Sequence, residues 1–166
     1  QPVLQLYDPN TQLPLQPLLM DRLQHAVSRM ERHQLGLAVC VLSARYIFNQ
    51  EMNPELKKQA EQHLVSRLIR SVRKSDTVAC LREDVYALIL EEIQNPRSVP
   101  LLTQKIVRAV SMPIHMREAA VEVRLSIGSS YFPLEGADAV SLLNLADNAM
   151  RAARLQAHFS LSPPAS

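Results

Sequence analysis

The sequence is poor in glycine and in cysteine. Gly36, Gly128 and Gly136 are its only three glycines, against eleven prolines. A protein that cradles phosphate on glycine-rich backbone would have to do so with one of these three. Cys40 and Cys80 each lie inside an apolar, strand-like run, which is typical of buried free thiols. Two cysteines in this length exclude a disulfide scaffold, and no ligand spacing around them indicates a metal site.

Long apolar runs and a strong net charge are also missing. No stretch approaches the ~18 consecutive apolar residues that span a membrane. No basic region followed by an apolar stretch marks a signal peptide, so we expect a cytoplasmic segment without membrane contact. The formal net charge of +2 is too small to indicate nucleic acid as a partner. The five histidines show no spacing that suggests a zinc or catalytic cluster.

The remaining composition is that of an ordinary globular domain. Of the 166 residues, 47% are hydrophobic and 20% are charged, which is enough for one core. We expect a lead-in segment over residues 1–16, one folded domain over residues 17–160, and a linker or tail over residues 161–166.

Apolar spacing predicts four helices. The first begins at Pro17, the second follows Pro54, the third covers residues 98–110, and the last begins after Asp138 as its N-cap. The polar side of the second helix is predicted to be a solvated face, and it carries Arg67, Arg70, Arg73 and Lys74.

Three further patterns predict strands. The continuous apolar run over residues 37–42 indicates a strand buried on both faces, and residues 121–127 alternate as in a strand with one buried face. Residues 77–81 and 85–90 flank a charged triplet, which predicts a β-hairpin with a charged tip. Strands mixed with helices around a central hairpin favour one α/β sandwich.

Four short segments follow one another along the chain. They are DPNTQLP from Asp8, RKSDTVA from Arg73, SIG with the later FP and G from Ser126 to Gly136, and LL…AD…AM…AR from Leu142 to Arg154. In the same order, they resemble motifs of the GGDEF family of diguanylate cyclases. The resemblance runs from about Asp8 to His158. It implies an α/β (α+β) domain with the GGDEF, nucleotidyl cyclase-like fold, in which helices flank a central, mostly antiparallel sheet.

The family's signature departs from its pattern in this chain. Where the family has G-G-D/E-E-F, the sequence reads Arg82-Glu83-Asp84-Val85-Tyr86. The resemblance implies a reaction that joins two GTP molecules with Mg²⁺ held by carboxylates and phosphates. The family's metal-binding aspartate aligns with Val41, and its next glutamate aligns with Val85. We therefore expect a degenerate domain that is not an enzyme, with no catalytic residues, no metal and no cofactor.

The resemblance also implies that some of the family's nucleotide-binding residues are retained in this chain. The family reads guanine with an Asn and an Asp, which align with Asn49 and Lys58, and Lys58 would oppose the base with donors instead of acceptors. Arg154 and His158 stand where the family has cations that contact phosphate. Asn49, Asp84 and Arg154 therefore define a hypothetical relic pocket that binds GTP without turnover.

The family's inhibitory product site, R-x-x-D, is matched by Arg73 and Asp76, five residues ahead of the signature. An arginine fork can pair with guanine O6 and N7, so cyclic di-GMP is a candidate ligand. The alternative is structural: an arginine at a helix end is favoured by the helix dipole, and Asp76 can hydrogen-bond backbone.

The resemblance leaves several roles open. The first is a regulatory or protein-interaction module in bacterial cyclic di-GMP signalling, with a protein partner or a fused sensory or phosphodiesterase (EAL) domain. The alternatives are a GTP-binding allosteric domain that controls a linked EAL domain, and a residual diguanylate cyclase.

Overall fold

The computed structural model describes residues 4–161, with side chains described as far as residue 157. Over these residues the helices are α1 (Gln16–His33), α2 (Pro54–Ser71), the short 3-10 turn η1 (Pro96–Ser98), α3 (Val99–Val110) and α4 (Ala139–Leu161). The strands are β1 (Gly36–Phe48), β2 (Thr77–Arg82), β3 (Val85–Ile93), β4 (Ile114–His115) and β5 (Ala120–Phe132).

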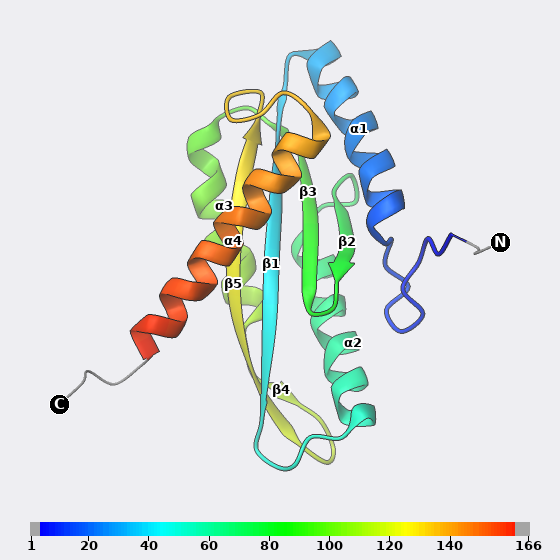
Figure 1. The fold of residues 1–166 in the computed structure, drawn as a ribbon, viewed down its shortest axis with the longest axis vertical. Helices are drawn as coiled ribbons and strands as arrows, with labels where there is room; N and C mark the ends of the chain where they lie inside the picture. Colours follow the sequence, from blue (N-terminus) through cyan, green and yellow to red (C-terminus); the bar gives the residue numbers. More distant parts are fainter. Residues whose placement is uncertain (1–3, 162–166) are drawn as a thin grey trace.

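The strands form one sheet in the order β2-β3-β1-β5-β4, and every neighbouring pair is antiparallel (Figure 1). The predicted sheet flanked by helices is therefore confirmed. The central strand β1 is buried from Gly36 to Ala44, in agreement with its apolar run. Its predicted end at Leu42 is wrong, because β1 continues to Phe48. The extra residues pair with β5 as far as Phe48 opposite Val121, a long-range contact that local pattern does not reveal.

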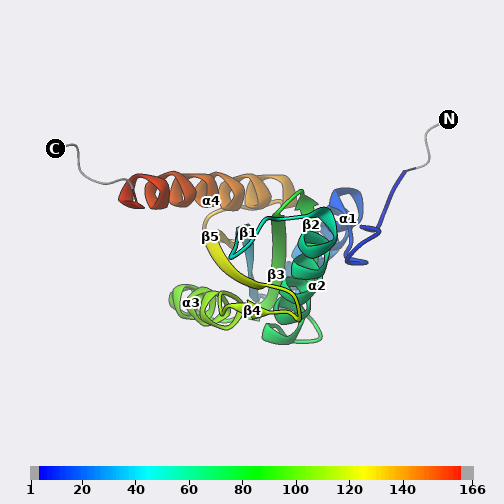
Figure 2. The same cartoon turned by 90° about the horizontal axis from the view of Figure 1, so that it is seen from below.

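Helices cover both faces of the sheet (Figure 2). Alternate residues of a strand point to opposite faces, so Val39 and Val41 join the core under α1 and α4, while Cys40 and Leu42 join the core under α2 and α3. Gly128 on β5 lies where α4 crosses, and a Cβ there would come within 2.1 Å of the Met150 backbone nitrogen. This glycine is required for the close approach of helix to sheet.

The predicted helix starts are confirmed to within a residue. Pro17 lies in the first turn of α1, and α2 starts at Pro54 after Asn53, whose side-chain oxygen accepts the Leu56 N–H at 2.9 Å. The Asp138 carboxylate accepts the Ser141 N–H at 2.8 Å, as an N-cap of α4 does. The predicted hairpin is confirmed as β2 and β3.

Other expectations need correction. Arg67 is not on a solvated face, because its guanidinium donates to the carbonyls of Val110 at 3.2 Å, Met112 and Pro113 at the end of α3. Arg73 and Lys74 lie beyond the end of α2, since Ser71 is its last residue.

The described residues nearest the two ends of the chain have defined contacts or secondary structure. In the lead-in segment Leu13 is buried, and the Pro14 carbonyl accepts the Cys80 N–H of β2 at 2.8 Å. The helix α4 includes Leu161, the first residue of the predicted tail, and residues 162–166 lie outside the described part. None of the helices within residues 4–161 has the length and apolar character needed to cross a membrane.

Candidate functional site

The tip of the β2–β3 hairpin is a two-residue turn of Glu83 and Asp84. Asp84 has a φ of 59°, a left-handed conformation that aspartate tolerates better than most residues. Its carbonyl accepts the Ala44 N–H at 2.9 Å, so the tip is fixed to the central strand β1.

The Asp84 carboxylate is already paired with a cation. Lys57 of α2 donates to its Oδ2 at 3.1 Å, and the same ammonium lies 3.5 Å from Glu61 and 3.9 Å from Glu83. Partial burial alone would lower the pKa of Lys57, but the hydrogen bond and charge of Asp84 outweigh it and raise that pKa. The other oxygen, Oδ1, is buried and accepts no hydrogen bond from the described residues.

Arg82, just before the tip, is held by the helix above it. Its guanidinium donates to both oxygens of Asp147 on α4, at 3.1 and 2.8 Å. Arg151, one turn further along α4, also donates to the Asp147 carboxylate, at 3.4 Å. The hydrogen bond from Arg82 is the main reason that the pKa of Asp147 is lowered. The bulk of Arg82 therefore points toward α4, and the most exposed side chain at the tip is that of Glu83, which is 87% exposed.

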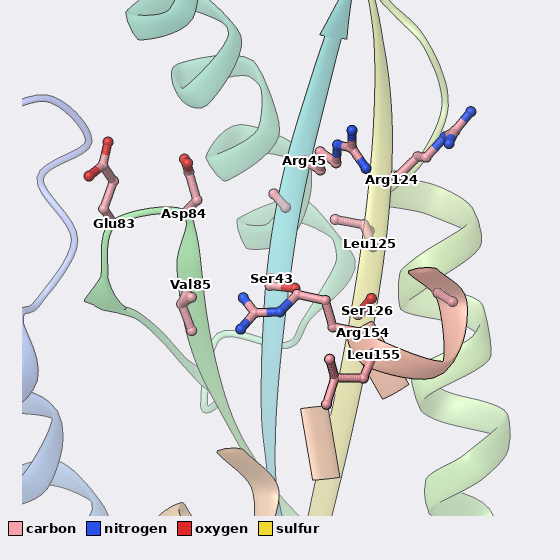
Figure 3. A pocket seen from close by; sticks show the side chains of 12 residues that line it. Ser43, Arg45, Glu83, Asp84, Val85, Arg124, Leu125, Ser126, Arg154 and Leu155 are labelled. Carbon is pink, nitrogen blue, oxygen red and sulfur yellow. The ribbon is translucent and has the colours of Figure 1, made fainter. Parts of the chain in front are cut away.

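A cavity of about 520 Å³ opens beside the tip (Figure 3). Its walls come from β1, the hairpin, β5 and α4, and they include Asp84 with Val85, three arginines (Arg45, Arg124, Arg154) and two leucines (Leu125, Leu155). Two of the predicted relic-pocket residues, Asp84 and Arg154, are thus brought to one cavity.

Asn49, the third predicted relic-pocket residue, is placed elsewhere. It follows the end of β1, and its side-chain oxygen accepts the Ala120 N–H at 3.2 Å. It is not among the residues that line the cavity, and neither is Lys58, whose carbonyl accepts a bond from Asn10. The structure therefore assigns Asn49 a contact at the start of β5.

Arg73 and Asp76 lie together on the wall of a second cavity, of about 610 Å³. Asp76 has a side chain only 3% exposed, and its two oxygens accept the N–H groups of Arg73 at 2.9 Å and Glu91 at 3.0 Å. The Arg73 guanidinium lies 3.5 Å from Asp76 and donates to the Glu91 carbonyl, yet 57% of the side chain is exposed. Asp76 therefore has the predicted structural role, and the arginine still has a face toward solvent.

Glu91 links this second cavity to α1. Its backbone carries the contacts to Arg73 and Asp76, and its side chain, 9% exposed, accepts a bond from Arg29 at 2.8 Å. Sequence spacing gives no sign of this pair, because 62 positions separate the two residues.

Neither metal ligation nor thiol chemistry is evident at these places. Over the described residues, no group of three or more His, Cys, Asp or Glu side chains is arranged to hold a metal ion. Cys40 and Cys80 are free, and burial raises their pKa values to about 12 and about 11. Both thiols therefore stay protonated near neutral pH.

Sequence reasoning missed Lys57, Arg45 and Arg124. Lys57 is one residue before the position that the guanine alignment singled out, and no motif marks it. Arg45 lies beyond the predicted end of the first strand. The alternation of residues 121–127 does place Arg124 on the polar face with Ser126, a signal that could have marked one wall of the cavity.

The chain belongs to the GGDEF family. The family described as "Diguanylate cyclase, GGDEF domain" matches residues 5–158. The fold agrees with solved domains of this family. The GGDEF domain of TpbB (YfiN) from Pseudomonas aeruginosa superposes with a TM-score of 0.79 at 25% identity, with 90% of this chain and 89% of that chain covered.

The chain is also similar to a curated bacterial protein and to a second solved GGDEF domain. It is 30% identical over 155 residues to MucR of Pseudomonas aeruginosa, a bifunctional diguanylate cyclase and cyclic di-GMP phosphodiesterase, covering 92% of this chain and 22% of MucR. The GGDEF domain of DgcB from Caulobacter crescentus, solved in complex with cyclic di-GMP, has the same fold at a TM-score of 0.70 and 18% identity, with 91% of each chain covered. The chain spans about a fifth of MucR and 36% of the diguanylate cyclase TpbB.

Proposed function

We propose that this GGDEF domain is catalytically silent and acts in cyclic di-GMP signalling as a regulatory or protein-interaction module. The state of Asp84 carries the proposal. Its Oδ2 is neutralised by Lys57 at 3.1 Å, and the next residue, Val85, offers no oxygen. Val41, which aligns with the family's metal-binding aspartate, pairs with Ala87 of β3 and offers none either. Val41 is fully buried in the core under α1 and α4.

The Mg²⁺ ion that the family's reaction uses does not fit these residues. Proteins hold Mg²⁺ with one or two carboxylates, waters and substrate phosphates. Here the one Asp84 oxygen without a hydrogen-bond partner among the described residues, Oδ1, is buried, and the ammonium of Lys57 on the other oxygen repels a divalent cation. Glu83 adds an exposed anion at the tip, which disfavours the approach of a triphosphate.

A turnover assay tests the proposal directly. Purified protein, in its full natural chain, is incubated with GTP and Mg²⁺, and product is followed by chromatography beside TpbB as the active control. We expect no cyclic di-GMP. Product that disappears in Asp84→Ala would show that the site still catalyses and would reject the proposal.

Cyclic di-GMP at Arg73 and Asp76 is the second part of the proposal. The two residues share the wall of the cavity of about 610 Å³, which is within the usual size of small-molecule sites. The Arg73 side chain is 57% exposed, so the guanidinium N–H groups that do not contact Glu91 and Asp76 can pair with guanine O6 and N7. The complex of DgcB with cyclic di-GMP supports a domain of this fold as its receptor.

Calorimetric titration with cyclic di-GMP tests this site. We expect saturable binding that Arg73→Ala abolishes. Arg70→Ala is the matched control, because Arg70 is an exposed arginine close in sequence that does not line this cavity. Equal loss in both variants, or no binding by the unmutated protein, would remove the site from the proposal.

The alternative role is a GTP-binding domain that controls a linked phosphodiesterase. It is supported by the similarity to MucR, which is named for both activities. In the full-length protein, phosphodiesterase activity would then change when GTP is added. An unchanged activity across saturating GTP would favour the interaction role instead.

A further inference from the structure

Charge is distributed unevenly along the chain. Residues 62–75, in the second half of α2 and the turn after it, and residues 93–117, which include α3, carry eight of the 18 Lys and Arg residues. The same two stretches contain none of the 16 Asp and Glu residues. The rest of the chain therefore has an acidic excess, and the net charge of +2 does not show this division.

The fold brings the two basic stretches together. Helices α2 and α3 pack over the same core, on the side of the sheet opposite to α4 (Figure 2). A hollow of about 330 Å³ lies between them, lined by Arg67, Arg70, Ser71, Ala109 and Met112 and by no carboxylate among the described residues. Burial, and then the charge of Arg70, lower the pKa of Arg67, so these cations add their charges without an acid between them.

Three cations of this surface have no counter-charge within the described part of the chain. Arg70 donates to the Ser66 carbonyl of its own helix at 3.4 Å, and no carboxylate lies within ion-pair distance of it, of Lys105 or of Arg108. Glu92 lines the cavity of about 610 Å³ together with Lys105, but the two are not an ion pair. The surface therefore presents positive charge to solvent.

Exposed apolar side chains lie among these cations. Ile69, Leu101 and Met112 are each more than half exposed. Lys105 and Arg108 follow Leu101 by four and seven positions, so the three share the outer side of α3. Large apolar side chains that are exposed together and bordered by charge mark interaction surfaces.

Seven side chains make up what we call the basic α2–α3 surface: Arg67, Arg70, Lys105, Arg108, Ile69, Leu101 and Met112. We propose that this surface binds an acidic, amphipathic segment of a partner protein. Carboxylates of the segment would pair with the three cations that lack a counter-charge, and an apolar side chain would enter the hollow beside Met112. The surface deepens the protein-interaction role proposed above and rests on that role.

A protein segment fits this surface better than a nucleic acid or a membrane. Protein interfaces have an apolar centre within a polar rim, and methionine adapts its shape to an inserted side chain. Recognition of anionic lipid uses clusters of about 4–8 Lys or Arg residues, and duplex DNA binders neutralise about 6–10 phosphates. Arg70, Lys105 and Arg108 are too few for either, whereas the hollow between two helices suits a side chain of a protein.

Fluorescence anisotropy of the full natural chain with labelled peptides tests the proposal. The probe is a synthetic helix-forming peptide in which one face carries leucines flanked by glutamates. Lysines replace the glutamates in one control peptide, and alanines replace the leucines in another. We expect saturable binding of the probe, at least about tenfold weaker binding of each control, and weaker binding of the probe as ionic strength rises.

Variants locate the binding on the surface. Arg70→Glu and Arg108→Glu should each weaken binding of the probe by about tenfold, and Met112→Ser by about fivefold. Arg22→Glu on α1 and Leu134→Ser after β5 are the matched controls, because both side chains are exposed outside this surface. They should change binding by less than about twofold. All five positions are exposed, so the variants should fold, and the far-ultraviolet circular dichroism spectrum checks this.

Four results would overturn the proposal. The first two are no saturable binding of the probe, and equal binding by the surface variants and the controls. The third is tighter binding of vesicles of anionic phospholipid, or of duplex DNA, that the same variants abolish, since the surface would then serve another class of partner. The fourth is a dimer in analytical ultracentrifugation that Arg70→Glu dissociates, because a second copy of the chain would then occupy the surface.

The peptide result can be separated from the two earlier proposals. Arg70→Glu should keep cyclic di-GMP binding, and Arg73→Ala should keep peptide binding, since the two residues line different cavities. Lys105 is not varied because it lines the cavity beside Arg73. The surface does not line the cavity beside the hairpin tip, so cyclic di-GMP formed in the GTP assay would reject the silent-domain proposal alone.

Discussion

Arg82 donates hydrogen bonds of 3.1 and 2.8 Å to the two carboxylate oxygens of Asp147, so that the hairpin strand β2 is joined to α4 by a bidentate ion pair. The Asp147 side chain is 16% exposed and that of Arg82 is 38% exposed. Arg82 stands at the position of the first glycine of the family signature. In this chain the side chain at that position joins β2 to α4. The residue at this position stabilises the hairpin.

Replacing Arg82 with alanine should therefore destabilise the domain. Partly buried bidentate pairs exceed ordinary surface ion pairs, so we expect a loss of about 1 kcal/mol in the free energy of unfolding. Urea denaturation followed by circular dichroism measures it. Arg151→Ala is the control, because its contact to Asp147 is one bond of 3.4 Å from a side chain 53% exposed, and its loss should stay below about 0.5 kcal/mol. Equal losses would show that the bidentate geometry contributes nothing.

The contribution of this pair should depend on pH in one direction. The folded protein lowers the pKa of Asp147 below the unfolded value of about 3.9. A lowered pKa means that the stabilisation is fully present above the unfolded value and is lost as pH falls through the folded value. The difference in unfolding free energy between the wild type and Arg82→Ala should thus be constant from about pH 7 to about pH 5 and shrink in more acid solution. A difference that grows as pH falls would contradict this assignment.

Lys57 and Asp84 should show energetic coupling. A double-mutant cycle with Lys57→Met and Asp84→Asn removes each charge while keeping similar volume. Their side chains are 20% and 31% exposed, so we expect a coupling free energy of about 1 kcal/mol. Lys57→Met alone should lower the free energy of unfolding by more than this coupling, because it leaves the Asp84 carboxylate unpaired. Denaturation of the four proteins gives the coupling. A value near zero would mean that solvent screens the pair and that Asp84 is available to other cations.

Much of the fold is predictable because its signals are local. Pro54 and Asp138 mark helix starts through fixed chemistry, and the charged triplet between two apolar runs marks the hairpin. The length of β1 is not predictable in this way. Residues 43–48 mix polar and apolar side chains, and pairing with β5, nearly eighty positions away, is what extends the strand.

The same distinction between local signals and long-range contacts applies to the candidate site. Arg73 and Asp76 are found from sequence because a short motif holds both, and Asp84 because it lies in the signature. The partners that decide what these residues do, Lys57 for Asp84 and Glu91 for Asp76, come from other elements. Asn49 is the opposite case: it matches the residue type of a family position, yet it does not line the cavity.

Gly128 should be intolerant of any side chain. A Cβ at this position would lie 2.1 Å from the Met150 nitrogen and 2.4 Å from the Ala146 carbonyl oxygen, both in the backbone of α4. Because backbone atoms cannot move aside without displacing the helix, Gly128→Ala should cost about 3 kcal/mol or more and reduce folded protein. Gly136→Ala is the matched control, since its Cβ would meet the Leu142 side chain at 3.1 Å and come no nearer than 3.5 Å to the Leu142 backbone nitrogen, and neither glycine has a positive φ. We expect a loss below about 1 kcal/mol there, measured by the same thermal and urea denaturation. If both variants were equally stable, α4 would not pack against β5 as closely as the structure shows, and the placement of Arg154 over the cavity would lose its support.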